Sequence, residues 1–348
     1  MVAFLVLDAS VKIDVALRIR TELEPWILDG NVVYKKYNKN DGIQRLSVNI
    51  NSTELMKYPN GNVCHISVSV NAFNYYGKDG KVDYKGIEQY LDNMMSDIGI
   101  HSLEWRIVYF TFVTTIKTDY VDKYMDFIDR TGAPKGKAET MECKPGWVKY
   151  ENGSRKLVID GVTHDDRLRL LLSIKNRKLN GIKQSDSYDF EDKLLTNMTN
   201  EIVDELEQLL WIEYLSKILG DSDYYSLNEA EKILKEKCEK ISDRHKLESI
   251  LKGISVYKGQ KGYLKHITDK ETPYDFMQEI SSKSTAEKFI RELESKYHIN
   301  PLIISRREAV DLSIKKLPGL ASLVNYAVYD SSKKSPKDEE IYPTFDYN

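Results

Sequence analysis

The stretch that decides the fold is VCHISVSVNAFNYYGKDG, residues 63–80. Its first eight residues, Val63–Val70, alternate apolar with small or polar side chains, a pattern typical of a β-strand with one buried face. The alternation ends at Asn71, and the aromatic residues and two glycines that follow indicate a turn. This turn is either part of a functional loop at the end of a strand or simply the end of a hairpin.

The rest of the N-terminal half repeats this strand pattern. Short apolar or alternating runs, separated by Asp-Gly and Asn-Gly turns, predict eight strands. The expected strands are Val2–Leu7, Asn31–Tyr37, Gln44–Ile50, Val63–Val70, Leu103–Val113, Gly146–Tyr150, Arg155–Asp160 and Arg167–Ile174. Apolar residues at helical spacing predict helices over Tyr84–Ile98 and Asp119–Ile128. We therefore expect an α+β domain with a mainly antiparallel sheet over residues 1–185.

Beyond residue 185 the apolar residues follow a helical period, which predicts a mainly helical domain over residues 186–330. The segments Asn200–Leu219 and Glu229–Leu251 are expected to be helices, and Thr272-Pro273 is expected to open another. Polar residues 331–348 are expected to form a mobile tail.

Three Ser-x-x-Glu sequences predict capping boxes at helix starts. Their serines are Ser226, Ser284 and Ser305. The last two would begin a pair of helices, Ser284–Tyr297 and Ser305–Lys316, that resembles a helix–turn–helix unit.

Composition excludes several classes of protein. Of 348 residues, 41% are hydrophobic and 30% charged, which is typical of a soluble globular protein. No apolar run reaches the roughly 20 residues that span a bilayer, and the apolar start is interrupted at Asp8. The three cysteines, Cys64, Cys143 and Cys238, lack the spacing of zinc ligands, which favours a reduced, cytoplasmic setting.

A basic run is the best candidate for a binding surface. Its cations are Arg155, Lys156, Arg167, Arg169, Lys175, Arg177, Lys178 and Lys183. Alternate residues of a strand share a face, so such a run can present several positive charges together to DNA phosphates. The formal net charge of −3 means that a DNA surface has to come from local clustering. The alternative interpretation is a solvated sheet edge, where cations discourage pairing with another strand.

The order of these motifs resembles the rolling-circle replication-initiation proteins of filamentous phages and related plasmids, the II/X group of HUH-like nickases. The similarity covers roughly residues 1–185 and lies in AFNYYG (72–77), LEWRIVYFTF (103–112), SRKLVIDG (154–161) and RLRLLLSIKNRKL (167–179). It implies a DNA-binding protein of a phage or plasmid that contacts single-stranded or origin duplex DNA.

The same resemblance implies that the nicking residues are substituted. Phe73 stands where the family has a metal-binding histidine, and Ile159 stands where it has the nucleophilic tyrosine. A nickase needs both, because the tyrosine attacks a phosphodiester that a bound metal ion polarises. In a relative of these enzymes Phe73, Ile159 and the strand 167–174 are expected to border one groove.

Displaced residues are the remaining candidates for nicking chemistry. The candidate nucleophiles are Tyr75, Tyr76, Tyr109 and Tyr150, and the candidate metal ligands are His65, His164 and Asp165. Mg²⁺ or Mn²⁺ is expected only if nicking survives. Phe73, Asn74 and Gly77 are candidate loop contacts to DNA, where aromatic rings can stack on unpaired bases.

Three hypotheses follow from the sequence. The first is a replication-initiation-like protein that binds DNA, with its nicking chemistry in question. The second is a non-enzymatic DNA-binding regulator or interaction module of a mobile element, with the helical domain available to a protein partner. The third is an unrelated two-domain protein whose motif order matches by chance.

Overall fold

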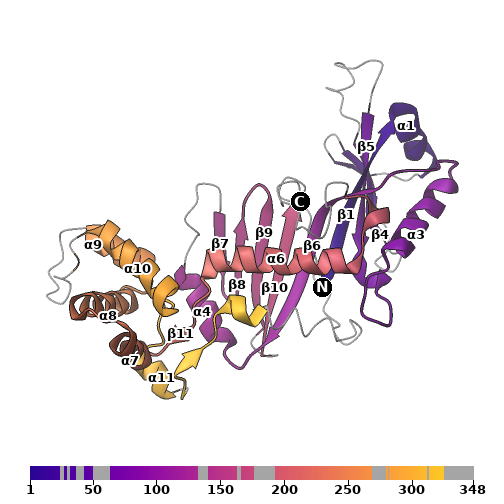
Figure 1. Cartoon of the computed structure of the whole chain (residues 1–348). Coiled ribbons are helices and arrows are strands. Elements are labelled where there is room, and N and C mark those ends of the chain that lie inside the picture. Colours follow the sequence, from indigo (N-terminus) through magenta and orange to yellow (C-terminus); the bar gives the residue numbers. More distant parts are fainter. Residues whose placement is uncertain are drawn as a thin grey trace.

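The fold is that of a computed structural model, which describes residues 1–23, 27–29, 32–36, 43–49, 63–131, 140–162, 166–175, 193–268, 280, 282–311 and 313–324. Ten strands form one antiparallel sheet in the order β2-β3-β4-β5-β1-β6-β10-β9-β8-β7 (Figure 1). The strands are β1 (Val2–Lys12), β2 (Ile27–Asp29), β3 (Val32–Lys36), β4 (Ile43–Asn49), β5 (Val63–Asn71), β6 (Arg106–Lys117), β7 (Thr140–Lys144), β8 (Trp147–Glu151), β9 (Arg155–Val162) and β10 (Arg167–Lys175).

Helices occur between the strands and dominate the C-terminal half. They are α1 (Ile13–Glu22), α3 (Tyr84–Ser96), α4 (Val121–Thr131), α6 (Asn200–Leu219), α7 (Leu227–Lys237), α8 (Ile241–Val256), α9 (Gln260–Thr268), α10 (Lys283–Tyr297) and α11 (Arg306–Asp311). A two-stranded sheet joins β11 (Tyr224–Tyr225) to β12 (Lys316–Leu317). The α+β class predicted from the sequence is confirmed.

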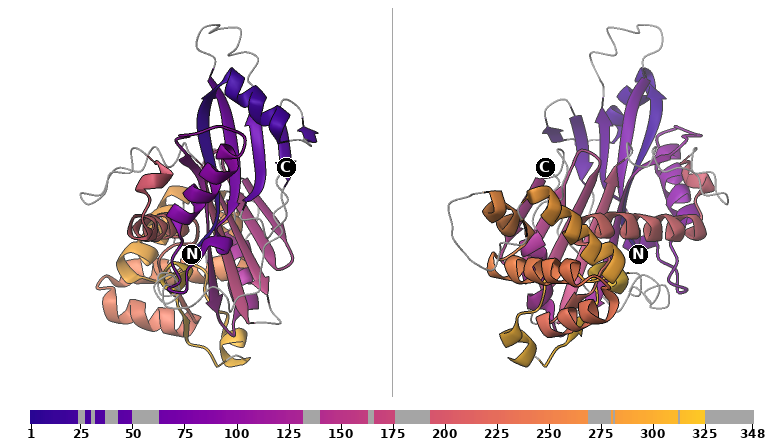
Figure 2. Two further views of the ribbon diagram at one scale, coloured as in Figure 1. Left: turned by 90° about the vertical axis from the view of Figure 1, so that its right-hand side faces the viewer. Right: turned by 60° about the vertical axis from the view of Figure 1, so that its left-hand side comes forward.

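The two faces of the large sheet have different partners. On β1, Leu5, Leu7 and Ala9 are buried in the main core, which includes residues from α1, α3, α4 and α6. Phe4 and Val6, on the other side of the same strand, belong to a separate small apolar cluster that contains no residue of a described α-helix. We call these two sides the helix-covered face and the opposite face; Figure 2 shows the helices gathered on one side of the strands.

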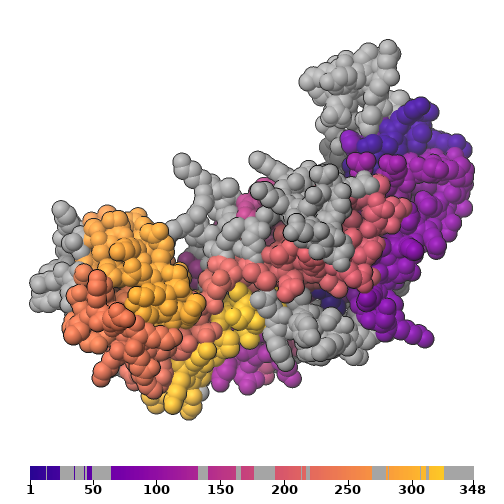
Figure 3. All heavy atoms as spheres, viewed as in Figure 1, coloured from indigo at the N-terminus to yellow at the C-terminus, as the bar shows by residue number. Residues whose placement is uncertain are grey.

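Helix α6 lies across the helix-covered face, from α3 to the C-terminal helices (Figure 1). In the space-filling view, helical residues therefore form most of the coloured surface on this side (Figure 3). Buried Glu207 of α6 accepts hydrogen bonds from the Met1 amino group at 2.6 and 2.8 Å and from Trp211 Nε1 at 3.1 Å. These contacts pair the buried Glu207 carboxylate with an opposite charge and a neutral donor, as burial requires.

Helix α4 packs closely on β9. A Cβ atom at Gly161 would lie 2.7 Å from Met125 Cγ, so a side chain at this position would push the helix away. The glycine in the IDG segment is therefore explained by close packing of the helix on the strand.

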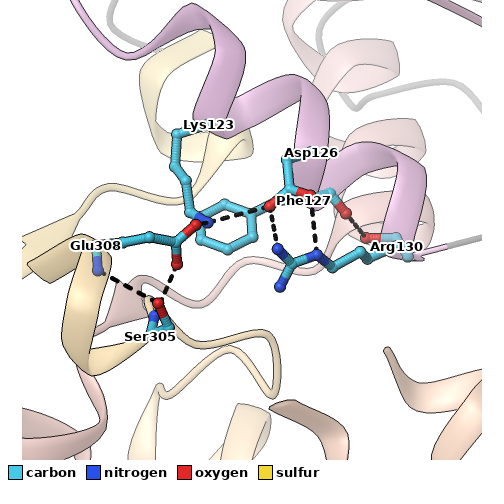
Figure 4. A network of polar contacts seen from close by, with 7 residues as sticks. Lys123, Asp126, Phe127, Arg130, Ser305 and Glu308 are labelled. Atoms are coloured by element: carbon cyan, nitrogen blue, oxygen red, sulfur yellow. Dashed lines mark hydrogen bonds and ion pairs between the residues drawn. The ribbon is translucent and has the colours of Figure 1, made fainter. Parts of the chain in front are cut away.

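The other side of α4 holds the C-terminal region through a buried lysine. Lys123 is 7% exposed, and its Nζ lies 2.6 Å from Glu308 Oε1, 3.0 Å from Asp126 Oδ2 and 4.6 Å from the centroid of the Phe127 ring (Figure 4). Burial of a charged lysine is costly unless opposite charges accompany it, and here two carboxylates do so. This cluster joins two segments that are 185 residues apart in the chain.

Two predicted capping serines are confirmed as N-caps. Glu308 N donates to Ser305 Oγ at 3.3 Å while Ser305 N donates to Glu308 Oε2 at 3.0 Å, the reciprocal pair of a capping box. Ser226 caps α7 through Glu229 N at 3.4 Å. The prediction for Ser284 is wrong, because α10 begins earlier and its N-cap is Ser282.

Other helix predictions need correction. The charged segment expected as one helix is divided between α7 and α8 at Cys238–Lys240, where the backbone at Cys238 is extended. The helix–turn–helix-like pair is also wrong, because α11 has only six residues and the chain before it makes parallel bridges from Ile299 and Ile304 to the β11 region. The helix expected at Thr272-Pro273 and the tail 331–348 lie outside the described residues.

We predict that Glu308→Ala lowers the free energy of unfolding by about 1–3 kcal/mol, because it leaves Lys123 with one carboxylate partner and removes half of a capping box. Urea titration at neutral pH measures the change. Glu229→Ala is the matched control, since Ser226 N donates to Lys315 O rather than to this glutamate. An equal effect of the two substitutions would contradict the role given to the Lys123 cluster.

The stabilisation from Glu308 is also expected to depend on pH. Burial opposes ionisation of this carboxyl, but the hydrogen bonds from Lys123 and Ser305 and the Lys123 charge outweigh burial and lower its pKa from 4.5 to about 2. A lowered folded-state pKa gives a contribution that is complete above about pH 4.5 and is lost as the pH falls toward 2. The difference in stability between wild type and Glu308→Ala should therefore shrink across this range, and a constant difference would contradict the pairing.

Candidate nucleic-acid interface

The opposite face carries most of the described cations of the predicted basic run. On β10, Arg167, Arg169 and Lys175 alternate with buried leucines and isoleucine, so they share the side of the small apolar cluster. Lys156 on the neighbouring β9 is opposite Ser173 and lies on the same side. Four of the predicted contacts are thus brought together by two adjacent strands.

Lys117 at the end of β6 adds a fifth cation that the sequence analysis missed. It is directly opposite Arg167 in the antiparallel ladder, and within the described residues neither side chain forms an ion pair. Like charges at directly opposed positions destabilise a sheet. The repulsion would be relieved by an anion bound between them.

Arg169 is partly neutralised within the protein. Its Nη2 lies 2.9 Å from Asp160 Oδ2, and the two side chains are 17% and 32% exposed. Of the four predicted cations on this face, Lys156, Arg167 and Lys175 lack an ion pair within the described chain.

The remaining predicted cations do not join this group. Arg155 has the opposite orientation on β9, where its guanidinium lies 4.5 Å from the centroid of the Tyr214 ring of α6 on the helix-covered face. It therefore does not share the face of the other cations, because adjacent residues of a strand point to opposite faces. Arg177, Lys178 and Lys183 lie outside the described residues.

A polar cluster lies on the same face at the β1–β5 pair. Asp8 Oδ2 is 3.0 Å from His65 Nδ1, and Asp8 Oδ1 accepts a hydrogen bond of 2.9 Å from Ser67 Oγ. His65 is 45% exposed on its side chain, so one side of its ring is available to a ligand. Asp8 is the member that sequence reasoning missed, although its interruption of an apolar strand was a visible signal.

The candidate metal ligands are brought together only in part. Asp8 and His65 form a pair, whereas His164 and Asp165 lie outside the described residues. Among the residues that are described, no group of three or more histidine, cysteine, aspartate or glutamate side chains is arranged to hold a metal ion.

The turn after β5 connects this strand to α3. The Asn71 side chain accepts a hydrogen bond from Phe73 N, and Asp83 N donates to Tyr75 O before the Asp83 side chain caps α3 through Gly86 N. Gly80 has a φ of 75°, which a side chain would strain. The stretch is therefore a structured strand-to-helix connection.

The predicted loop contacts have different positions in this turn. Phe73 packs against the small apolar cluster of the opposite face, while Asn74 and Gly77 are exposed. Of the three, Phe73 is the one placed beside the strands that carry the cations.

The four candidate tyrosine nucleophiles differ in the environment of their hydroxyl groups and in the face on which they lie. Burial raises the pKa of Tyr76 and of Tyr150, and burial with the neighbouring Tyr90 raises that of Tyr75 to about 12. A raised pKa makes the attacking phenolate harder to form. Tyr109 is half-buried and belongs to the opposite face, two register positions along β1 from Asp8.

Ile159 does not share a surface with Phe73. It is fully buried in the main core on the helix-covered face, whereas Phe73 packs on the opposite face. The expectation that these two residues border one groove is wrong, because the sheet lies between them. Burial of an isoleucine side chain stabilises a fold by about 1.5–3 kcal/mol, which is sufficient reason for its presence.

No helix in the described part of the chain is long and apolar enough to cross a bilayer. Comparison with known proteins adds no assignment: no family model, no curated protein and no solved structure matches this chain.

Proposed function

We propose that this chain binds DNA through the opposite face of its large sheet. The observation that carries the proposal is a group of cations that form no ion pair within the described residues and that three adjacent strands place on one face: Lys117, Lys156, Arg167 and Lys175. Each phosphate neutralised by such a cation releases condensed counterions, and this release supplies most of the affinity of sequence-independent binding.

The shape of this face supports a nucleic-acid ligand better than a small one. The cations extend along β10 from Arg167 to Lys175, a separation of eight residues, or about 27 Å in an antiparallel strand. Phosphates along one DNA strand repeat at intervals of several ångströms, so one DNA strand can contact all of these cations. Half-buried Tyr109 and Phe73 lie on the same face as these cations and offer rings for stacking on unpaired bases.

The biological role that we propose is that of a replication-initiation-like protein of a phage or plasmid. This part rests on the order of the sequence motifs alone. The alternative is a DNA-binding regulator or a protein-interaction module of a mobile element. Since Ile159 and Phe73 lie on different faces, the proposal makes no use of a substituted nicking site.

Metal-dependent nicking is a second candidate function, favoured by one observation. Asp8, His65 and Tyr109 lie on the same face as the cations, so a carboxylate, an imidazole and a tyrosine would all face a bound strand. Asp8 and His65 would hold Mg²⁺ or Mn²⁺ in place of their mutual hydrogen bond, and the ion would polarise a phosphate.

For DNA binding, we predict that Lys156→Gln, Arg167→Gln and Lys175→Gln together weaken the affinity and reduce the dependence of log K on log salt by about 2 for single strands or 3 for duplex. Fluorescence anisotropy over a series of salt concentrations measures both quantities. The matched control changes three exposed lysines of α7, Lys232, Lys235 and Lys237, to Gln, with the same change in net charge. Equal losses in the two triple variants would show a non-local charge effect and contradict the proposal.

For the second function, nicking of supercoiled DNA in Mn²⁺ is expected to require Tyr109, the one candidate tyrosine on this face. Tyr109→Phe should abolish the relaxed product, while Tyr75→Phe, which changes a tyrosine of the main core, should keep it. Gel electrophoresis of the plasmid detects the product. Nicking that survives Tyr109→Phe would exclude this arrangement and leave the binding proposal intact.

A further inference from the structure

A cleft of about 390 Å³ lies where β1 runs into α1. Its wall includes residues from β1, from the first turns of α1 and from the 99–103 segment that follows α3. This volume is within the range of roughly 300–1,000 Å³ found for sites that bind small molecules.

The charged groups of the cleft are mostly positive. The cations Lys12 and Arg18 line it together with His101, Ser10 and one carboxylate, Asp14. Within the described residues neither Lys12 nor Arg18 forms an ion pair. With two unpaired permanent cations against one carboxylate, the cleft favours an anionic ligand.

Local packing gives two of these side chains defined positions. Arg18 Nη1 donates to Gly99 O at 3.4 Å, and a Cβ atom at position 99 would lie only 2.6 Å from Arg18 Nη2. The absence of a side chain at Gly99 therefore makes room for the guanidinium. His101 Nδ1 lies 3.2 Å from Ser96 Oγ, so Nε2 is the ring nitrogen left for a ligand.

We infer that this cleft binds a phosphate group. A guanidinium matches the oxygens of a phosphate in two parallel hydrogen bonds, and an ammonium supplies a second positive charge. Asp14 opposes the anion and limits its affinity.

The position of the cleft indicates two sources for the phosphate. Ser10 is the cross-strand partner of His65, so the cleft lies at the end of β1 next to the polar cluster of Asp8 and His65. A DNA strand on that face could place its terminal phosphate in the cleft, and this source rests on the proposed function. A mononucleotide is the other source, and its binding does not depend on the proposed function.

Isothermal titration calorimetry with inorganic phosphate, thymidine 5′-monophosphate and thymidine tests the inference. We expect saturable binding of the first two and none of thymidine. Arg18→Gln should weaken binding roughly tenfold or more, because it removes at least one charge-assisted hydrogen bond. Asp14→Asn should strengthen binding, a gain that misfolding cannot imitate.

Arg20→Gln is the matched control, because Arg20 is on the same helix but does not line the cleft. The inference is overturned if neither phosphate nor the monophosphate binds saturably, or if Arg18→Gln and Arg20→Gln weaken binding equally.

Oligonucleotides with and without a 5′-phosphate distinguish the sources. Tighter binding of the phosphorylated strand, lost in Arg18→Gln, identifies the DNA end as the ligand. Equal binding of the two strands, with monophosphate binding still dependent on Arg18, identifies a small phosphate compound. Either result supports the phosphate site, and the second does not depend on the proposed function.

Discussion

Successive residues of a β-strand point to opposite faces, and this constraint decides which side chains of the protein can act together. On β9 it sends Ile159 into the main core and Asp160 toward Arg169 on the opposite face. On the same strand it sends Arg155 to the Tyr214 ring and Lys156 to the face with the other cations. A group of residues that is continuous in sequence thus divides into one set in the main core and one set on the opposite face.

The helix-covered face depends on how the C-terminal region is attached. Helix α4 contacts β9 closely at Gly161, and its Lys123 binds Glu308 from the far end of the chain. Tyr124 Oη donates to Pro318 O at 2.9 Å, and the Phe127 ring stacks on Tyr224 with centroids 4.2 Å apart. These three residues, within two turns of α4, thus hold the C-terminal helices beside the helix-covered face.

The sequence predicted much of this fold because its signals are local. Alternation identified the central strands, and the Ser305–Glu308 spacing identified a capping box that forms both hydrogen bonds. Helix α1 was missed although Ile13, Ala16 and Ile19 have helical spacing, since it follows β1 directly and no capping side chain marks its start. The break between α7 and α8 at Cys238 was missed because the sequence there contains no glycine or proline that would signal it.

The candidate binding surface was only partly predictable, for a physical reason. Periodicity shows which residues of one strand share a face, and this was correct for Arg167, Arg169 and Lys175. It does not show which strands are neighbours, so Lys117 opposite Arg167 and Asp8 beside His65 required the strand order. Nor does it show which of two faces the helices cover, so it could not test the expectation, taken from the family resemblance, that Ile159 and Phe73 share one surface.

The central claim is that DNA meets the sheet on the opposite face, which no described helix covers. The most direct measurement is photo-crosslinking from a benzophenone amino acid placed at Tyr109 on that face or at Ile212, which is 38% exposed on the outside of α6. The claim predicts DNA adducts from position 109 and none from position 212. Adducts from position 212 alone would place the DNA on the helical side and contradict it.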